Sequence, residues 1–364
     1  MRIGVITIEA GHNYGGILQC YAFMKQLQSY GHKVEFLRVY PHSYGMIDNI
    51  RSILATRNVF SLIFGQRSHA IFSKEESEEM TIVFDKFREE YMNLSPLQTY
   101  KTVGEYANDN YDAIFIGSDQ TWAGLYNRNN AVFIGWQPKF KGIRMSYACC
   151  SPYKHIYDPI RKRQLSNFLN DFSYISVRDK NTQTLIKSIT GKTVDIVPDP
   201  TELRSFEEFV QDEPVVKGKY IVAYVLGDEI TGGHKLALDK IRKQFGDMPI
   251  IGIKTANSNT GVHNVADRMM NSLTPQQWVN LIYNATAVYT DSFHAILFSL
   301  KFKKPFIAYY TLAVRASRLL YLKEKYNTNN IVSCAREISK AEVLNHKSID
   351  ISFFDELMKK NGLL

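Results

Sequence analysis

Short apolar runs alternate with longer amphipathic stretches along most of this chain. At its start, residues 2–8 form the kind of apolar run that predicts a buried strand. The next stretch carries apolar residues at the spacing of one helix face: Ile17, Leu18, Tyr21, Met24 and Leu27. Gly31 ends this predicted helix, and residues 34–40 predict a second strand. A strand, a helix and a strand in this order predict a β-α-β unit and a parallel sheet with right-handed crossovers.

The same alternation recurs in two series, which a polar stretch at residues 205–219 separates. The first series predicts strands at residues 113–117, 145–150, 174–177 and 194–197, with helices at 159–171 and 181–188. The second series predicts strands at residues 220–226, 250–253, 287–289 and 306–310, with helices at 235–245, 275–283 and 293–301. Residues 45–110 are less regular, and we interpret them as an insertion with helices at 47–55 and 75–91.

This order of elements predicts an α/β fold with two Rossmann-like, doubly wound domains that face each other across a cleft. We expect the N-terminal domain to span residues 1–204, with the helical insertion at about 45–110. The C-terminal domain is then expected to span residues 205–364, with its last helices packing back on the N-terminal domain.

Three polar segments follow predicted strands, at residues 13–16, 118–122 and 291–294. Ligands in doubly wound folds bind outside the carboxyl ends of the strands, so we expect these segments to line the cleft. The third segment precedes a predicted helix, whose first backbone N–H groups and dipole favour an anion such as phosphate or carboxylate. Asp291 and Ser292 can also cap that helix. A histidine at this turn, His294, can move a proton beside a bound anion.

The composition is that of a soluble globular protein, because 45% of the 364 residues are hydrophobic and 22% are charged. No apolar run approaches the roughly 18 residues needed to span a bilayer. The initial apolar run ends at Glu9 without a small-residue cleavage site, so we expect a first strand and a cytoplasmic location. The four cysteines lack a C-x-x-C spacing, and we predict neither a zinc site nor a redox motif.

The net charge of +8 is concentrated in two clusters, at residues 139–163 and 301–325. Each cluster has seven lysines and arginines against one acidic residue. Such clusters attract anionic substrates, nucleic acid or an acidic membrane surface, and solvated helix faces are the alternative interpretation. Aromatic residues make up 13% of the chain and are spread along it, which favours core packing over a stacking platform for bases. We therefore expect no nucleic-acid partner.

Six short motifs resemble, in the same order, those of the polysaccharide pyruvyl transferase family. They are NYGGILQ at 13–19, GSDQTW at 117–122, SYA at 146–148, SVRD at 176–179, DPT at 199–201 and TDSFHA at 290–295. The resemblance covers about residues 3 to 310. It implies a GT-B-like fold of two Rossmann-type domains. It also implies transfer of pyruvate from phosphoenolpyruvate onto two sugar hydroxyls as a cyclic ketal, usually during assembly of cell-surface polysaccharide. No cofactor is implied, because phosphoenolpyruvate is itself the donor substrate.

This chemistry needs cations or helix N-termini for the donor's carboxylate and phosphate, and an acid/base that works near neutral pH. The resemblance places an arginine and a histidine at the donor site, and the matching residues are Arg178 and His294. We predict that His294 is the acid/base and that Arg178 clamps the carboxylate or phosphate. The alternatives are a satisfied buried histidine, and a salt bridge from Arg178 to Asp179 or Asp199. No metal is required, and no D-x-D string is present.

The remaining predicted site residues fall into donor and acceptor groups. Some members of the family carry Arg-Leu-His where this chain has Ser-Phe-His at 292–294, so a cation is missing here. We predict that the donor site also includes Asn13, Gly15, Asp291 and Ser292, with Lys304, Arg315 or Arg318 supplying the charge. We predict that Ser118, Asp119, Gln120 and Trp122 bind the acceptor. The alternatives are that the last three are turn residues, with Asp119 as an N-cap and Trp122 packed in the core. The motif at 199–201 is interpreted as structural.

Three functions remain open at this point. The first is a pyruvyl transferase that acts on a lipid-linked or polymeric sugar at the inner face of the membrane, where the 301–325 cluster could dock. The second is a GT-B glycosyltransferase that uses a nucleotide sugar, in which Asp291 would grip the ribose. The third is a noncatalytic carbohydrate-binding protein of the same pathway.

Overall fold

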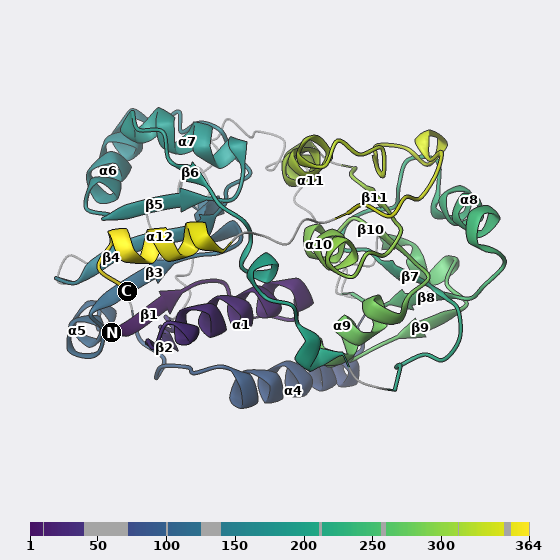
Figure 1. The fold of residues 1–364 in the computed structure, drawn as a ribbon, viewed down its shortest axis with the longest axis horizontal. Coiled ribbons are helices and arrows are strands. Elements are labelled where there is room, and N and C mark those ends of the chain that lie inside the picture. The colour runs from purple at the N-terminus through teal and green to yellow at the C-terminus, as the bar shows by residue number, and fades with distance from the viewer. Residues whose placement is uncertain are drawn as a thin grey trace.

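The computed structural model describes residues 1–9, 11–39, 72–99, 101–124, 140–210, 213–255, 260–311, 313–345 and 351–363. Two parallel six-stranded sheets, each flanked by helices, make up this part of the chain (Figure 1). The prediction of two Rossmann-like, doubly wound units is therefore confirmed. The helix predicted at residues 47–55 falls outside the described residues.

The first sheet has the strand order β2-β1-β3-β4-β5-β6, so the order reverses between β1 and β3. Its strands are β1 (Arg2–Ile6), β2 (Lys33–Phe36), β3 (Ala113–Ile116), β4 (Ile143–Cys149), β5 (Tyr174–Val177) and β6 (Asp195–Ile196). Its helices are α1 (Tyr14–Ser29), α4 (Lys74–Tyr91), α5 (Val103–Asn110), α6 (Pro159–Asn170) and α7 (Lys180–Thr190). Ile3 of β1 pairs in parallel with Val34 of β2 on one side and with Ala113 of β3 on the other.

The second sheet has the order β12-β11-β10-β7-β8-β9, and its order reverses between β7 and β10. Its strands are β7 (Ile221–Tyr224), β8 (Ile250–Ile253), β9 (Arg268–Met270), β10 (Ala287–Thr290), β11 (Phe306–Tyr309) and β12 (Ile331–Val332). The helices that follow these strands are α8 (His234–Phe245), α9 (Pro275–Asn284), α10 (Phe293–Lys301) and α11 (Ala313–Lys325). The last helix is α12 (Ser352–Lys360).

Short 3-10 helices occupy several of the connections. They are η1 (Gln120–Gly124), η3 (Pro200–Leu203), η4 (Glu207–Phe209), η6 (Val262–Asn264) and η7 (Ala335–Glu337). The chain passes from the first sheet to the second through η3 and η4. This connection therefore runs beside the carboxyl end of β6, where η3 begins.

Capping residues set where several helices begin and end. Ser73 and Glu76 form a capping box at the start of α4, with the Ser73 N–H donating to the Glu76 carboxylate at 2.8 Å. Thr274 and Gln277 form the same arrangement at the start of α9. Gly191 ends α7 in the left-handed conformation, with φ of 75°.

The pattern of apolar residues does not predict β9, β12, α5, α11 or α12. β9 and β12 have three and two residues, which are too few for an alternating pattern to be recognised. The predicted strand at residues 34–40 ends at Phe36, and Val39 beyond it pairs with Gln98 instead of β1. The basic stretch at 301–325 contains α11, whose lysines and arginines obscured its apolar face.

The two sheets share one apolar core. The ring of Tyr14 in α1 stacks on Trp278 of α9 at 5.7 Å and lies 5.1 Å from Phe84 of α4. Phe206, in the connection between the sheets, meets Phe298 of α10 edge-on at 4.9 Å. All five side chains belong to a single buried cluster that takes residues from both sheets. The two units are therefore packed against each other through α1, α4, α9 and α10.

Two further segments tie the units together. Helix α12 returns to the first sheet, where Phe354 packs on Tyr30 and Tyr147 at 5.6 and 5.2 Å (Figure 1). Helix α4 lies below α1 in Figure 1, and its Glu76 carboxylate pairs with Lys254, just after β8, at 2.6 Å. Both contacts join residues that are far apart in the sequence. Among the described helices, none combines the length and hydropathy needed to cross a membrane.

Candidate functional site

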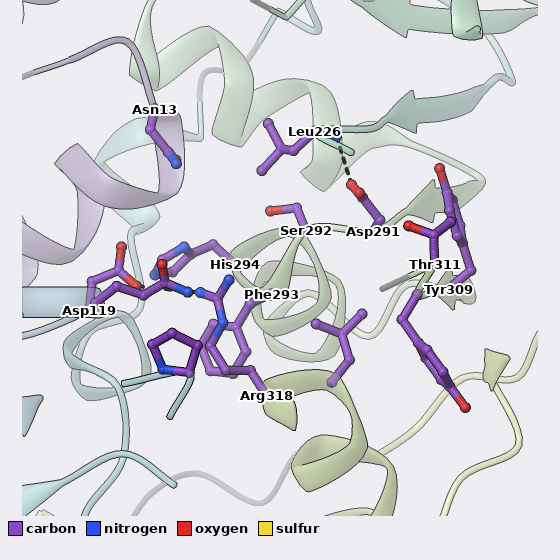
Figure 2. A pocket seen from close by; sticks show the side chains of 14 residues that line it. Asn13, Asp119, Leu226, Asp291, Ser292, Phe293, His294, Tyr309, Thr311 and Arg318 are labelled. Atoms are coloured by element: carbon purple, nitrogen blue, oxygen red, sulfur yellow. Dashed lines mark hydrogen bonds and ion pairs between the residues drawn. The ribbon is translucent and has the colours of Figure 1, made fainter. Parts of the chain in front are cut away.

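A pocket of about 390 Å³ lies where the carboxyl ends of both sheets meet. The first sheet contributes the loops after β1, β3 and β4, and the second contributes the loops after β7, β10 and β11. Figure 2 shows Asn13 on one side of this pocket, Asp119 and Arg318 below it, and Asp291 to His294 at its centre. This is the position at which doubly wound folds bind their ligands.

Segment 290–295 forms a strand-to-helix turn at the pocket wall, because β10 ends at Thr290 and α10 begins at Phe293. The Ser292 hydroxyl caps α10 by accepting a hydrogen bond from the Ala295 N–H at 3.4 Å. The Thr290 hydroxyl accepts the Ser292 N–H at 2.9 Å and so fixes the turn. The positive end of the α10 dipole therefore faces the pocket.

A second helix begins at the same place. Asn13 caps α1 by accepting a hydrogen bond from the Gly16 N–H at 3.1 Å. Gly15 lies directly against the imidazole of His294, so that a Cβ at this position would stand 2.3 Å from the ring's Cγ and Nδ1 atoms. Only glycine allows this close approach of α1 to α10. With two helix N-termini converging on one pocket, the site favours an anion.

His294 is 5% exposed and lies next to a buried carboxylate. Its Nε2 atom is 3.6 Å from Oδ2 of Asp199, which is within ion-pair range but longer than a hydrogen bond. Among the described residues, no group makes a hydrogen bond to this Nε2 atom. The ring nevertheless lines the pocket, so His294 lies between the Asp199 carboxylate and the pocket.

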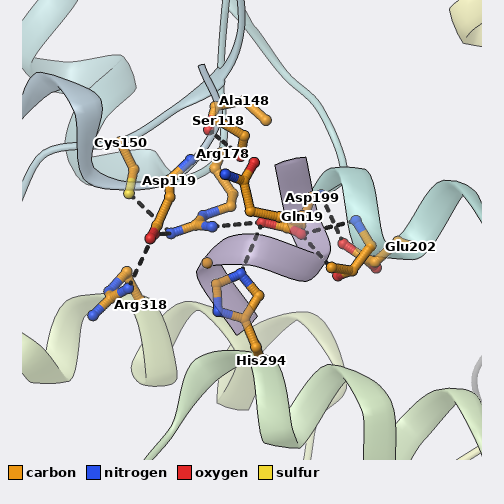
Figure 3. A network of polar contacts seen from close by, with 12 residues as sticks. Gln19, Ser118, Asp119, Ala148, Cys150, Arg178, Asp199, Glu202, His294 and Arg318 are labelled. Carbon is orange, nitrogen blue, oxygen red and sulfur yellow. Dashed lines mark hydrogen bonds and ion pairs between the residues drawn. The ribbon is translucent and has the colours of Figure 1, made fainter. Parts of the chain in front are cut away.

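Arg178 is buried behind the pocket wall with 2% of its side chain exposed. Its Nη1 atom donates to Asp199 at 2.5 Å and its Nη2 atom to Asp119 at 2.8 Å (Figure 3). The guanidinium also lies 4.3 Å above the ring of Phe293. The expected alternative of an ion pair with Asp199 is thus present, together with one to Asp119. Asp179 instead caps α7 by accepting the Thr182 N–H at 2.8 Å.

Both carboxylates of this network are held in their ionised form. Burial raises the pKa of the Asp199 carboxyl, but the charges of His294 and Arg178 outweigh burial and hold that pKa well below its usual range. Burial likewise opposes ionisation of Asp119, and the charges of Arg178, His294 and Arg318 lower its pKa despite it. One guanidinium therefore fixes two carboxylates, of which one faces His294 and the other the pocket.

Of the three cations considered as substitutes for the missing charge at position 292, Arg318 reaches the pocket. Its Nη1 atom is 3.5 Å from Asp119, and 21% of its side chain is exposed. Lys304 lies at the other end of α10, where its Nζ atom is 5.5 Å from the ring centre of Tyr283. Arg315 is in α11, and its side chain falls outside the described part of the structure.

Asp291 is bound to the backbone of the neighbouring strand. Its Oδ1 and Oδ2 atoms accept hydrogen bonds from the N–H groups of Leu226 and Gly227, each at 2.7 Å. These two residues follow β7, at the point where the strand order of the second sheet reverses. The Asp291 carboxylate is therefore held by the loop after β7, at the switch point of the second sheet.

The residues predicted to bind the acceptor divide into two pairs. Asp119 and Gln120 line the pocket. Ser118 is buried, and its hydroxyl donates to the Ala148 carbonyl at 3.2 Å. Trp122 is 0% exposed and belongs to the apolar core beneath the first sheet. The structure thus brings two of the four residues to the pocket.

The sequence predicts a structural role for Asp199, or a salt bridge to Arg178. Its Oδ1 atom does cap η3, accepting the Thr201 N–H at 2.9 Å, while Oδ2 faces Arg178 and His294. The sequence of a capping aspartate does not reveal whether its second carboxylate oxygen has another partner. One feature did indicate a role in the site: the DPT motif at 199–201 is one of the six family-like motifs, together with those that contain Arg178 and His294.

Two lysines of the basic stretch at 301–325 are bound to distant parts of the chain. Lys301 donates to the Arg204 carbonyl at 2.5 Å, and Lys325 pairs with Glu202 at 3.4 Å. Both contacts face the connection between the sheets. Within the described residues, no group of three or more histidine, cysteine, aspartate or glutamate side chains is placed to hold a metal ion.

Comparison with known proteins relates the motifs to a protein family and the fold to solved structures. Residues 13–311 match the family model of polysaccharide pyruvyl transferases. No curated protein sequence matches the chain. Among solved structures, S. aureus MnaA in a complex with UDP is 11% identical, with a TM-score of 0.51 over 100% of this chain and 97% of that chain.

A second solved structure, of a Listeria monocytogenes protein assigned as a UDP-N-acetylglucosamine 2-epimerase, is 10% identical. Its TM-score is 0.53, over 100% of this chain and 96% of that chain. At these identities the similarity concerns the fold. The GT-B-like arrangement of two Rossmann-type units predicted from the sequence is confirmed.

Proposed function

The chain belongs to the polysaccharide pyruvyl transferase family, and from this premise we propose that it transfers pyruvate from phosphoenolpyruvate onto two hydroxyls of a sugar as a cyclic ketal. The sugar would belong to a cell-surface polysaccharide under assembly. The position of His294 carries the proposal. Its ring stands at the pocket wall, between the N-terminus of α1 and the carboxylate of Asp199.

In the proposed reaction, His294 donates a proton to the methylene carbon of phosphoenolpyruvate, which becomes a methyl group. Positive charge develops at C2, and one sugar hydroxyl attacks this carbon. The bond between C2 and the phosphate oxygen breaks, and the second hydroxyl closes the ketal. The sugar hydroxyls lose two protons in all. One proton is gained by the methyl carbon and one by the released phosphate, so the protons balance. The reaction therefore needs neither an oxidant nor a reductant.

Asp199 and Arg178 would support this histidine without touching the donor. Asp199 orients the imidazole and offsets the charge that the ring carries when it holds a proton, as the aspartate of a catalytic triad does. Arg178 holds Asp199 in place and shares its positive charge between two carboxylates. We therefore assign Arg178 a positioning role, in place of the direct clamp expected from the sequence.

Arg318 and the two helix N-termini would bind the anionic donor. Arg318 lines the pocket and is partly exposed, and a guanidinium forms strong bonds with both carboxylate and phosphate. Asn13 and the Ser292 hydroxyl stand at the starts of α1 and α10, where the dipoles favour negative charge. Asp119 and Gln120 also line the pocket and would receive the acceptor hydroxyls.

A nucleotide-sugar glycosyltransferase is the competing function for this fold. It requires an acidic residue that is free to grip a ribose, and Asp291 instead binds two backbone N–H groups. A noncatalytic saccharide-binding protein is the other competitor. It gives no reason for a histidine that is buried between a carboxylate and a ligand pocket.

Incubation with donor and acceptor tests the proposal. The protein is supplied with phosphoenolpyruvate and an extract of lipid-linked sugars, and inorganic phosphate is measured together with the mass of the products. We expect phosphate release that matches the appearance of a pyruvyl ketal. Turnover of UDP-N-acetylglucosamine with no turnover of phosphoenolpyruvate would establish the glycosyltransferase instead. Sugar binding without any phosphate release would favour the noncatalytic protein.

A further inference from the structure

A second pocket, of about 630 Å³, adjoins the first. Pro152, in the loop after β4, lines both pockets. Helix α11 also borders both, with Arg318 and Leu319 on the first and Ser317 and Leu320 on the second. The second pocket therefore continues the proposed donor pocket along α11, between the two units of the molecule.

We propose that this second pocket binds the sugar units next to the one that receives the ketal. The acceptor is then an oligosaccharide or polymer, and a single sugar fills the site only in part. This inference rests on the proposed function and deepens it. It also moves most of the acceptor contacts away from residues 118–122, where Ser118 and Trp122 are buried.

The aromatic lining matches the shape of a sugar ring. Tyr153, Tyr157 and Tyr321 all border the second pocket. Tyr157 is 48% exposed and the neighbouring Leu320 is 41% exposed, so both present apolar surface to solvent. A pyranose ring has an apolar C–H face and a rim of hydroxyls, and tyrosine combines an apolar ring with a polar tip. Stacking of one on the other would cover the exposed rings.

The polar lining matches the hydroxyl rim. The Ser317 hydroxyl is buried at the pocket and makes no hydrogen bond within the described part of the chain. Lys180 of α7 and Glu324 of α11 form an ion pair across the pocket, so a donor and an acceptor stand together there. Sugar hydroxyls both donate and accept, and they suit such a mixed set. Lys154 borders the pocket as well, so its charged side chains suit a neutral or an acidic saccharide.

The volumes of the two pockets also favour an acceptor that extends from the first pocket into the second. The first pocket, at about 390 Å³, is at the small end of the range of roughly 300–1,000 Å³ that is typical for small-ligand sites. It has to contain phosphoenolpyruvate and the reacting diol together. Further sugar units extend beyond it, and the adjoining pocket gives them the larger space.

Saturation-transfer NMR with titration tests this inference without requiring turnover. The probes are β-linked trisaccharides of galactose, glucose and mannose, each paired with its methyl monosaccharide. We expect at least one trisaccharide to bind with a Kd ten or more times lower than its monosaccharide. Tyr157→Ala should abolish this gain and Tyr157→Phe should keep it. Tyr283→Ala, which removes an exposed tyrosine from α9, is the matched control and should also keep it.

The outcomes separate this inference from the proposed function. Equal binding of every trisaccharide and its monosaccharide would overturn the assignment of the second pocket, as would a gain that survives Tyr157→Ala. Ketal formation on single sugars with no gain from chain length would leave the proposed function intact and remove this inference. Trisaccharide binding that depends on Tyr157, without ketal formation from phosphoenolpyruvate, would support this inference and contradict the proposed function.

Discussion

Gly15 and His294 belong to different sheets, and their contact brings the two units together at the proposed chemistry. The imidazole lies so close to the α1 backbone that any side chain at position 15 would overlap it. A misplacement of about 1 Å in a catalytic group can reduce a rate by roughly 100-fold. The contact therefore makes the position of His294 sensitive to a single methyl group.

Gly15→Ala should displace the His294 ring, since the new Cβ would stand 2.3 Å from Cγ and Nδ1. We expect loss of most ketal-forming activity and a decrease of about 1–3 kcal/mol in the free energy of unfolding, measured by urea denaturation. Gly16→Ala is the matched control, because its Cβ would lie 3.5 Å from the Asn13 side chain, an ordinary contact. Equal behaviour of the two variants would show that the close contact is unimportant.

Arg318→Ala should weaken binding of phosphoenolpyruvate. A hydrogen bond to a charged group contributes about 1.5–3 kcal/mol, so we expect the Kd to rise by roughly 10- to 100-fold. The increase in melting temperature with ligand concentration gives this Kd. Lys323→Ala removes the same charge from α11 but does not alter the pocket lining, and it should bind like the wild type. An unchanged Kd in Arg318→Ala would exclude this arginine from the donor site.

The sequence predicts those site residues that directly follow one strand. His294, Ser292 and Asn13 follow strands, and the structure places all three at the pocket. The partners of Arg178 were only partly foreseen, because the contact with Asp119 joins two different strand ends and depends on how the backbone turns after β3. Pairing of Asp199 with His294 joins the two sheets, and no local pattern encodes it.

At the scale of elements, the two ends of α10 differ in character. Its N-terminus faces the pocket, while its last residue, Lys301, is largely buried against the connection between the sheets. Burial lowers the pKa of Lys301 to about 8, although Glu202 and Asp199 oppose this shift. A lysine of an unfolded chain has a pKa of about 10.4.

This difference predicts an unusual pH dependence of stability. Between pH 8 and about 10.4, the unfolded chain binds more protons at Lys301 than the folded chain does, so the free energy of unfolding rises with pH. Urea denaturation should show the wild type gaining on the order of 1–3 kcal/mol relative to Lys301→Met across this window. A difference between the two proteins that stays constant with pH would mean that Lys301 titrates normally when folded.

The pattern of apolar and polar residues predicted most of the described elements. Its strands were recognisable because strands buried on both faces appear as continuous apolar runs. It reproduced α10 at residues 293–301 and β8 at 250–253 to the residue. It missed β12, whose two residues carry no periodic signal. The proposed division of the chain into domains at residue 204 remains a prediction.

At the scale of the whole molecule, the shared core joins the two sheets. Tyr14, Phe84 and Trp278 come from three helices that belong to different sheets, yet their rings form one cluster, in which Tyr14 stacks on Trp278 and is tilted against Phe84. The ion pair between Glu76 and Lys254 adds a polar tie along α4. Contacts between separate domains of one chain are comparatively polar, and the shared apolar core favours a single cooperative unit.

We expect the two sheets to unfold together. Pulsed hydrogen exchange at increasing urea should give the same midpoint for peptides that cover β4 and β10. Phe84→Ala, which removes a fully buried ring at the junction, should lower both midpoints equally and cost about 3–5 kcal/mol. Separate midpoints for the two strands would show that the units fold independently despite their common core.

The most direct test of the proposed chemistry is the reaction carried out in D2O with phosphoenolpyruvate and the acceptor saccharide. Protonation of the methylene carbon by an exchangeable group at His294 predicts a ketal whose methyl group carries one deuterium, with one phosphate released for each ketal. His294→Ala should lose at least 100-fold in this rate, since general acid-base groups contribute roughly 10²- to 10⁴-fold. A ketal without deuterium, or an unchanged rate in His294→Ala, would contradict the assignment of His294 as the proton donor.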